Sequence, residues 1–456
     1  MKKLYNLCLG IALFSMLNSC NKEEKLNVKI ENYDTFTSGP LDDWIYKNLT
    51  QPYNIEVIYR YQRNMHDINK NISPTQEDKV IPQMEVVMKA FLDVYAAVGG
   101  EMFIKTFTPK QFVLFGSGDY DPDGSVKGGT ADGGRRITLY GLNGFDNTNA
   151  NAVQGNLQVV HHEFTHILNQ NRLIPPDYEQ VCKGDYLADW TSSKNTTAVA
   201  RGLGFITPYS RKAVGEDFAE VLSHLIVAGQ LFYDNAAYTA GKDAYAKFKL
   251  KESIVRDYMT QYYNIDVTQL QLEFQRIMES IYKSTNYTAG LAISNNYLGS
   301  LDWDIRNAWG VENTISEKQK VLFTNILDEL GGWTTKTMTF QFVSATKATL
   351  NITFGDKDRT WTASYDFDIA KNPDNSFKIN KSATQGTEGN YGNGALDWVL
   401  KDTQPLIDYL GGTTFTMDWK NAEINKNPND YLQYLIMKDN KDPNATIFGK
   451  VNLRKY

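Results

Sequence analysis

Three of the five histidines of the chain lie close together in the stretch HHEFTH, residues 161–166. Residues four apart share one face of a helix, so His162 and His166 can bind the same metal ion. Glu163 projects beside them, where its carboxylate can accept a proton from water. We therefore predict a helix that binds one zinc ion, with Glu163 as the general base. His161 lies about a third of a turn off this face, and we expect it to face solvent or to support a ligand.

Two histidines leave a zinc site incomplete, and no third histidine follows His166 at the short spacing that metzincins use. The sequence GEDFAE, residues 215–220, begins the next strongly helical run. Glu216 and Glu220 lie four apart on one face of it, so one can bind zinc while the other orients a ligand histidine. Two acids in a first helical turn also match the helix dipole, so the pair indicates a ligand only together with the histidine motif.

The motif H-E-F-x-H, followed about fifty residues later by E-x-F-A-E, resembles the gluzincin peptidases, in particular the lethal-factor-like group. The resemblance implies that Glu216 is the third zinc ligand and that Glu220 supports a histidine, a choice that spacing alone leaves open. It also implies a catalytic tyrosine seven residues before the ligand glutamate, where Tyr209 stands. A phenol at that place can donate a hydrogen bond to the oxyanion that forms when water adds to a peptide carbonyl.

The N-terminus predicts export and a lipid anchor. MKK is a positive region, LYNLCLGIALFSML is an apolar run, and LNSC, residues 17–20, resembles a bacterial lipobox. We expect residues 1–19 to be removed as a signal peptide and Cys20 to carry lipid, with residues 20–40 as a polar tether. The following NKEEK resembles the export signal of Bacteroidetes surface lipoproteins, although a soluble spacer fits as well. Cys182 is then the only remaining thiol, so the mature chain has no internal disulfide.

Apolar periodicity predicts the elements that position the motif. We expect strands at 54–62, 111–117 and 135–142, a Gly- and Asp-rich loop at 116–134, helices at 82–99, 156–172, 213–232, 252–263 and 266–283, and a loop-rich stretch at 173–208. With the resemblance above, this order predicts an α+β, zincin-like catalytic domain at 41–332. The strand RRITLYGL, residues 135–142, is our candidate for an edge strand that pairs with an extended substrate, although an internal strand fits as well.

The pattern changes near residue 333. KTMTFQFVSATKATLNITFGD and RTWTASYDFDI alternate polar and apolar residues, as half-buried strands do. The candidates for the buried face are Phe340, Phe342, Leu350, Ile352 and Phe354. We therefore predict a mostly β C-terminal domain at 333–456, and we assign its aromatic residues to a core rather than to a ligand platform.

The loop at 116–134 contains DYDPDG, which matches the first half of a calcium loop with Asp119, Asp121 and Asp123 as ligands. The twelfth position is Thr130 instead of a bidentate glutamate, and Pro122 restricts the loop. We therefore expect a solvated turn and keep a Ca²⁺ site as the alternative.

The chain resembles the substrate-import-associated zinc metallohydrolase lipoproteins of Bacteroidetes over about residues 15–290. The resemblance rests on the order of four stretches: the lipobox, SGPLDDWIYKNLTQPYNIEVIYRY, VVHHEFTHIL and EDFAE. The resemblance implies a lipid-anchored outer-membrane protein, exposed at the cell surface. It also implies a TonB-dependent transporter and its lipoprotein lid as partners, and a peptide or protein as substrate.

We therefore predict an outer-membrane zinc metallopeptidase linked to nutrient import. The alternative is a non-catalytic surface lipoprotein that binds peptide or glycan in an uptake complex, and the intact Glu163 favours the enzyme, because a degenerate enzyme commonly loses this base. A purely structural metal site would need a fourth protein ligand, for which Cys182 is the only thiol. The net charge of −6 and the lack of a basic run argue against nucleic acid as a partner.

Overall fold

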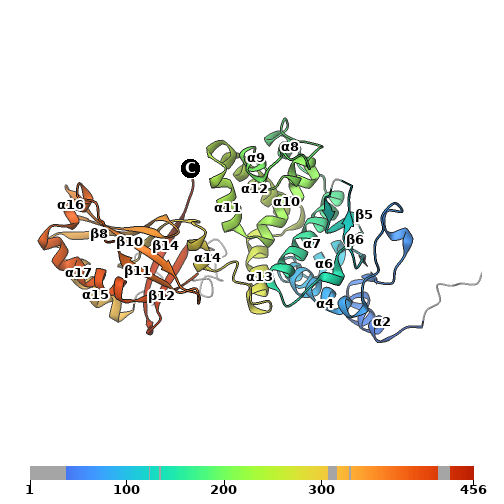
Figure 1. Ribbon diagram of the computed structural model, residues 1–456, viewed down its shortest axis with the longest axis horizontal. Coiled ribbons are helices and arrows are strands. Elements are labelled where there is room, and N and C mark those ends of the chain that lie inside the picture. The colour runs from blue at the N-terminus through green and yellow to red at the C-terminus, as the bar shows by residue number, and fades with distance from the viewer. Residues whose placement is uncertain (1–36, 123, 133–134, 307–315, 328–329, 420–431) are drawn as a thin grey trace, which may run out of the picture. The chain divides into compact units, whose positions relative to one another are not determined.

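The computed structural model describes residues 37–122, 124–132, 135–306, 316–327, 330–419 and 432–456 (Figure 1). The chain divides into two compact units, residues 1–43 and 44–456. In the first unit, the described part starts α2 (Pro40–Ile45), where the Asp42 carboxylate accepts a hydrogen bond from the Gly39 amide. The expected signal peptide, Cys20 and most of the expected tether lie outside the described residues. Among the described helices, none is long and apolar enough to cross a membrane.

The second unit contains a mixed four-stranded sheet of order β1-β2-β6-β5. β1 (Glu56–Ile58), β2 (Gln111–Leu114) and β6 (Arg136–Leu139) run parallel, and β5 (Gly129–Asp132) pairs antiparallel with β6. One edge of the sheet is therefore β5, which lies in the stretch expected to be a loop. The candidate edge strand at 135–142 is internal, because β6 pairs with a strand on each side.

The rest of the Gly- and Asp-rich stretch is also more regular than expected. A short hairpin pairs β3 (Asp119–Tyr120) with β4 (Val126–Lys127). Its strands are too short to show the alternation by which a strand is recognised in a sequence.

Helices make up most of the remaining part of the chain up to residue 294. They are η1 (Tyr46–Thr50), α3 (Gln51–Tyr53), η2 (Arg63–Met65), α4 (Glu77–Val87), η3 (Met88–Leu92), α5 (Asp93–Gly99), α6 (Glu101–Phe107), η4 (Leu142–Gly144), α7 (Ala150–Asn171), α8 (Pro176–Val181), α9 (Thr197–Gly202), η5 (Tyr209–Lys212), α10 (Val214–Val227), α11 (Gln230–Thr239), α12 (Lys242–Tyr263), α13 (Val267–Ser280) and α14 (Ala289–Ser294). The helix expected at 82–99 begins earlier, at Glu77, so Pro82 lies inside α4.

The motif helix α7 forms because its sequence supplies both a capping residue at its N-terminus and an apolar face that can be buried. The Asn149 side chain caps it by accepting hydrogen bonds from the Asn151 and Ala152 amides. Its apolar residues recur every three or four positions, and Val153, Leu157, Val160, Phe164, Ile167 and Leu168 are at most 1 % exposed. α7 packs along α10, and α10 also packs on α13, so the three helices lie together in Figure 1.

The C-terminal part is a closed eight-stranded antiparallel barrel of order β10-β11-β12-β13-β14-β7-β8-β9. Its strands are β7 (Leu298–Trp303), β8 (Thr334–Ser344), β9 (Lys347–Gly355), β10 (Thr360–Lys371), β11 (Phe377–Lys381), β12 (Thr414–Trp419), β13 (Tyr434–Asp439) and β14 (Asp442–Leu453), and its helices are α15 (Glu317–Leu327), α16 (Asn390–Gly394) and α17 (Asp397–Gly412). The prediction of a mostly β C-terminal module is thus confirmed. One of its strands, β7, precedes residue 333, where the module was expected to begin.

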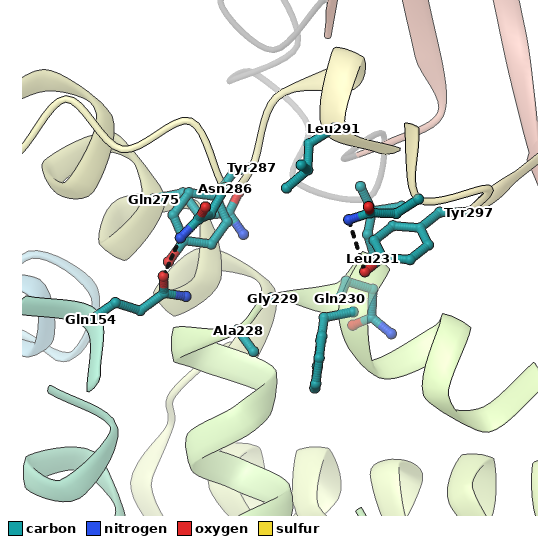
Figure 2. Close-up of a pocket in the computed structure, with 12 residues that line it drawn as sticks. Gln154, Ala228, Gly229, Gln230, Leu231, Gln275, Asn286, Tyr287, Leu291 and Tyr297 are labelled. Atoms are coloured by element: carbon teal, nitrogen blue, oxygen red, sulfur yellow. Dashed lines mark hydrogen bonds between the residues drawn. The ribbon is translucent and has the colours of Figure 1, made fainter. Parts of the chain in front are cut away.

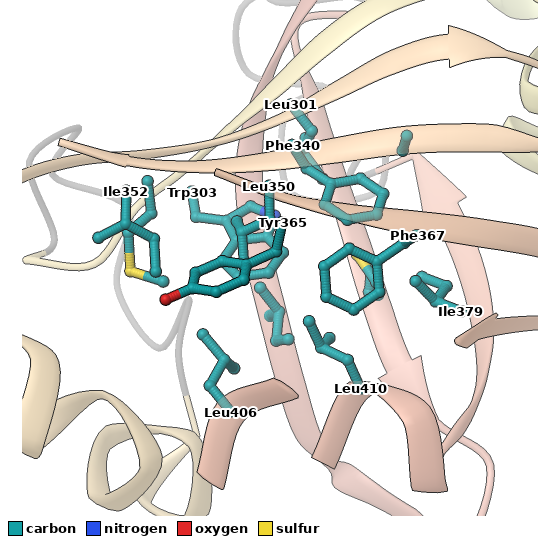
Figure 3. Packing of buried hydrophobic residues seen from close by; sticks show 14 of the residues in the cluster. Leu301, Trp303, Phe340, Leu350, Ile352, Tyr365, Phe367, Ile379, Leu406 and Leu410 are labelled. Atoms are coloured by element: carbon teal, nitrogen blue, oxygen red, sulfur yellow. The ribbon is translucent and has the colours of Figure 1, made fainter. Parts of the chain in front are cut away.

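The barrel has its own hydrophobic core (Figure 3). All five residues expected to face inward are at most 3 % exposed: Phe340, Phe342, Leu350, Ile352 and Phe354. Figure 3 shows Phe340 and Phe367 pointing from the strands towards Leu406 and Leu410 of α17. Each strand of a barrel has one buried and one outer face, so apolar and polar residues alternate along it. This alternation allows the buried residues to be predicted from the sequence.

Substitution of two glycines, one in β5 and one in α7, can test how closely these elements pack. A Cβ added at Gly129 would lie 2.5 Å from a Val159 methyl group of α7 and 2.9 Å from the Thr138 carbonyl oxygen, whereas one added at Gly155 of α7 would meet nothing within 4 Å. We predict that Gly129→Ala lowers the free energy of unfolding by about 1–3 kcal/mol through overpacking. Gly155→Ala, its matched control, should raise it by up to about 1 kcal/mol through helix propensity. Urea denaturation measures both, and equal stabilities of the two variants would contradict the close approach.

Candidate metal centre

The predicted site residues come together where α7 packs on α10. α7 carries His162, Glu163 and His166, and α10 carries Glu216 and Glu220. His162, Glu163 and Glu220 are at most 8 % exposed. Because the two helices lie side by side, residues about fifty positions apart in the sequence become neighbours.

Three of these side chains point their ligand atoms at one another. The Nε2 atoms of His162 and His166 are 3.1 Å apart, and they lie 3.2 and 3.1 Å from Glu216 Oε2. Among the described residues, these three form the group that could hold a metal ion. Ligands about 2.0–2.2 Å from a tetrahedral zinc ion are about 3.3–3.6 Å apart, so the triangle is nearly the size that zinc requires. Two nitrogens, one carboxylate oxygen and a remaining open direction fit a catalytic rather than a closed zinc site.

Glu220 lies behind this triangle. Its Oε1 is 2.9 Å from Nδ1 of His162, the ring nitrogen that faces away from His166, and its Oε2 accepts a hydrogen bond from the Thr207 hydroxyl at 2.7 Å. Burial alone would raise the pKa of the Glu220 carboxyl, but His224 and His162 lower it to about 2. An ionised carboxylate at Nδ1 fixes the orientation of the ring and increases the basicity of Nε2. The geometry therefore favours Glu216 as the ligand and Glu220 as the residue that supports His162, as the resemblance implies.

The ligand set is electrostatically matched to a cation. Burial alone would lower the pKa of His162, but hydrogen bonds to Glu216 and Glu220 outweigh it and raise the pKa to about 10. Burial would also raise the pKa of the Glu216 carboxyl, and hydrogen bonds from His162, His166 and Lys212 hold it well below its usual range. Without metal, His162 thus carries a proton between two carboxylates, and a metal ion that binds here takes over its positive charge.

Glu163 lies beside the triangle and under the edge strand. The Ala131 amide of β5 donates a hydrogen bond to its carboxylate. Burial raises the pKa of the Glu163 carboxyl, although His162 and His166 act in the opposite direction. A carboxyl group whose pKa is raised towards neutrality is suited to both accepting and returning a proton.

Tyr209 lies beside His162, with its ring centre 5.8 Å from the His162 ring and 4.8 Å from the Trp190 ring. Burial and the Glu216 carboxylate raise the pKa of Tyr209 well above its usual value. The phenol therefore stays protonated at any physiological pH and can act as a hydrogen-bond donor.

These groups open into a cleft of about 590 Å³. It is lined by Asp121, Ser125, Val126, Lys127, Gly128, Gly129, Thr130, Ala131, Gln158, Val159, His162, Glu163, His166, Trp190, Tyr209, Lys212, Glu216 and Glu220. Residues of the β3–β4 hairpin and of β5 thus line the cleft together with Trp190, Tyr209 and Lys212.

A second cavity, of about 250 Å³, has a different character (Figure 2). Amide, aromatic and aliphatic side chains line it, and none of its lining residues is an acid, a histidine or a basic residue. Figure 2 shows the hydrogen bond between the Asn286 and Gln154 side chains, and the Asn295 amide donates a hydrogen bond to the Tyr297 hydroxyl. This lining offers no carboxylate, imidazole or thiol to bind a metal ion, so the cleft at His162 is the candidate site.

The alternative calcium site has no support in the structure. Lys70 Nζ lies 3.1 Å from Asp119 and 2.5 Å from Asp121, and Lys127 contacts both carboxylates at 3.7 and 3.2 Å. Ammonium groups therefore stand where a calcium ion would bind. Asp123, the third expected ligand, lies outside the described residues.

Cys182 is not part of the centre. It is 2 % exposed, packs with Ala200 and Phe205, and its thiol donates to the Leu203 carbonyl oxygen. The fourth protein ligand that a structural metal site would need is thus not supplied by this thiol.

Sequence reasoning missed three groups that contact the site. Lys212 reaches Glu216 Oε1 at 2.7 Å, and its spacing four before Glu216 is a readable signal for a helical ion pair. Thr207 reaches Glu220 through the folding of a loop, and Ala131 reaches Glu163 through the four-residue edge strand β5. The sequence carries no comparable signal for either contact.

The match to a protein-family model agrees with this chemistry. Residues 34–268 match the family model described as "Putative zinc-binding metallo-peptidase". A solved structure described as a putative zinc-binding metallo-peptidase from Bacteroides caccae ATCC 43185 is 26% identical; the match covers 55% of this chain and 98% of that chain, with a TM-score of 0.44. No curated protein matches the chain.

His161, by contrast, belongs to the core. It is fully buried between Phe91, Tyr95 and Phe274, and its Nε2 donates a hydrogen bond to the Ala90 carbonyl oxygen at 3.2 Å. The expectation that it faces solvent is wrong, because α7 is covered on that side by η3 and α13. Burial lowers the pKa of His161 to about 4.

This shift predicts a pH-dependent stability. Between pH 6.5 and about 4 the unfolded chain protonates His161 while the folded chain does not, so the free energy of unfolding should fall as the pH falls, by up to about 3 kcal/mol. In His161→Gln, which keeps a neutral donor, this contribution should vanish. Urea denaturation of both proteins with chelator at pH 4–7 measures it. Parallel pH profiles would contradict the prediction.

Proposed function

Because the chain belongs to the putative zinc-binding metallo-peptidase family, we propose that it is a zinc-dependent metallopeptidase that hydrolyses peptide bonds at the cleft beside His162. The observation that carries the proposal is the convergence of His162, His166 and Glu216 within 3.2 Å of one another, with Glu163 beside them. The proposed stoichiometry is one zinc ion per chain.

The proposed mechanism divides the work among the residues of the cleft. When bound, zinc supplies Lewis acidity, which polarises a peptide carbonyl and makes water a nucleophile near neutral pH. Glu163 takes the proton of the attacking water and passes it to the leaving amine. Tyr209 donates a hydrogen bond to the developing oxyanion, and Glu220 keeps His162 in its orientation.

An extended peptide is the substrate shape that this cleft suits. β5 lies at an edge of the sheet, and residues 128–131 line the cleft. An edge strand offers backbone groups that pair with an extended chain independently of its sequence. Gly128 and Gly129 lack side chains over Val159, which keeps this strand close to the helix that carries Glu163.

We further propose that the protein is a lipoprotein anchored in the outer membrane, exposed at the cell surface, and linked to nutrient import with a TonB-dependent transporter and its lipoprotein lid. The lipobox that ends at Cys20, the NKEEK that follows it and the resemblance to import-associated lipoproteins support this proposal.

The peptidase proposal predicts that Glu163→Gln separates zinc binding from activity. The variant should retain close to one zinc ion per chain, because Glu163 is not in the ligand triangle, but its cleavage of a mixed peptide library should fall by about 10²–10⁴-fold. Glu179→Gln, an exposed glutamate on α8, is the matched control and should behave as the unaltered protein. Metal analysis and mass spectrometry of the peptides measure both quantities.

The outcomes distinguish the rival functions. Zinc in all three proteins with cleavage by none would favour the non-catalytic binding protein. Cleavage by Glu163→Gln at the unaltered rate would exclude Glu163 as the base. Absence of zinc from the unaltered protein would overturn the site.

The anchor proposal predicts that Cys20 is acylated. In a bacterial host that processes lipoproteins, the unaltered protein should incorporate a labelled fatty acid and sediment with membranes, whereas Cys20→Ser should do neither. Cys8→Ser is the matched control, because Cys8 leaves with the signal peptide and its loss should change neither result. Acyl label on the Cys20→Ser protein would contradict the assignment.

A further inference from the structure

Lys212 links two groups of the proposed reaction centre. It ends η5 (Tyr209–Lys212), and the extended residue Ala213 separates it from α10, which carries Glu216. Its Nζ lies 2.7 Å from Glu216 Oε1 and 3.2 Å from the Tyr209 hydroxyl oxygen. An ammonium group has three hydrogens to donate and no lone pair, so it donates to both oxygens.

The two oxygens of Glu216 therefore have different partners. Oε2 faces the histidine pair at 3.2 and 3.1 Å, while Oε1 faces the Lys212 ammonium. A carboxylate can bind a cation through one oxygen or through both. A charge-assisted hydrogen bond to Oε1 competes with metal binding by this oxygen and so favours Oε2 as the ligand atom. One-oxygen binding preserves the open position that water and a substrate carbonyl need.

Lys212 also determines what the Tyr209 hydroxyl can do. In the substrate-free protein this hydroxyl is hydrogen-bonded to the Glu216 carboxylate. Because Lys212 donates to the phenol oxygen, the phenol hydrogen must point elsewhere, either to Glu216 or to an oxyanion. When the hydroxyl turns to an oxyanion, the Lys212 ammonium remains on Glu216 Oε1, so this oxygen does not lose its partner.

We propose that Lys212 is a positioning residue that holds Glu216 as a ligand through Oε2 alone and directs the Tyr209 hydroxyl hydrogen towards the reacting carbonyl. The proposal rests on the proposed function, since it assigns a role within the same centre. The contacts of Nζ with both groups, rather than with one carboxylate, distinguish Lys212 from an ordinary ion pair on a helix.

The same geometry makes the proposal testable without unfolding the protein. The Lys212 side chain is 42 % exposed, and exposed ion pairs four residues apart contribute little to stability. Lys105, four after Glu101 and 41 % exposed at a 2.9 Å contact, provides a matched pair outside the cleft. Lys105→Met should therefore report any general effect of losing such a pair.

The first test uses cobalt as the probe. Zinc-free unaltered, Lys212→Met, Lys212→Arg and Lys105→Met proteins are titrated with Co²⁺, whose visible absorption weakens as its coordination number rises above four. We expect Lys212→Met to show a weaker band, because Glu216 Oε1 becomes free to bind. Lys212→Arg, which keeps a cationic donor, and Lys105→Met should match the unaltered protein.

The second test separates binding from chemistry with a cleaved peptide. Lys212→Met should lower kcat by about 10–100-fold with little change in KM, because partners of ligand residues contribute that much to activity. Lys212→Arg should recover most of this loss. In Tyr209→Phe, the further effect of Lys212→Met should be smaller than in the unaltered protein, since both act on the same hydroxyl.

The two tests can contradict the two roles of Lys212 separately. An unchanged cobalt spectrum in Lys212→Met would overturn the role at Glu216, and fully additive effects with Tyr209→Phe would overturn the role at Tyr209. Because the cobalt spectrum needs no substrate, it decides the Glu216 role even if no peptide is cleaved. If the unaltered protein bound no cobalt, the metal site itself would fail, and this proposal with it.

Discussion

The packing of α7 against α10 is the contact on which the rest of the site depends. It brings two imidazoles and two carboxylates into a buried space with three ligand atoms within 3.2 Å of one another. Such a cluster is costly to bury unless a positive charge sits inside it. A proton on His162 serves this role in the metal-free protein, and a zinc ion serves it better because it satisfies all three ligand atoms at once.

A second layer of contacts holds the side chains of this cluster in place. Glu220 binds His162 from behind, Thr207 binds Glu220, and the Ala131 amide binds Glu163. Each partner comes from a different segment, so α10, the loop before η5 and β5 must all be folded before the reacting groups are oriented. Precise positioning in metal sites commonly relies on such outer contacts rather than on the ligands alone.

The C-terminal barrel illustrates which patterns a sequence carries strongly. Its long strands alternate over nine or more residues, and their buried faces, including Phe340 and Leu350, are readable without a structure. β7 is separated from β8 by about thirty residues that include a helix, so its place between β14 and β8 follows from barrel closure and not from its own six residues. β3, β4 and β5 are shorter still, and they were expected to be loop.

Sequence alone was enough to predict that His162 and His166 share one face, because their four-residue spacing needs only the local geometry of a helix. It also predicted the α+β fold class and the β module, both of which follow from local periodicity. The tertiary structure decided what periodicity cannot express. Glu216 and Glu220 are equivalent on an isolated helix, and only the packing of α10 against α7 turns one towards the ligand nitrogens and the other towards Nδ1 of His162. The same packing encloses His161 in the core, since a helix buried on several sides leaves no solvent-facing position there.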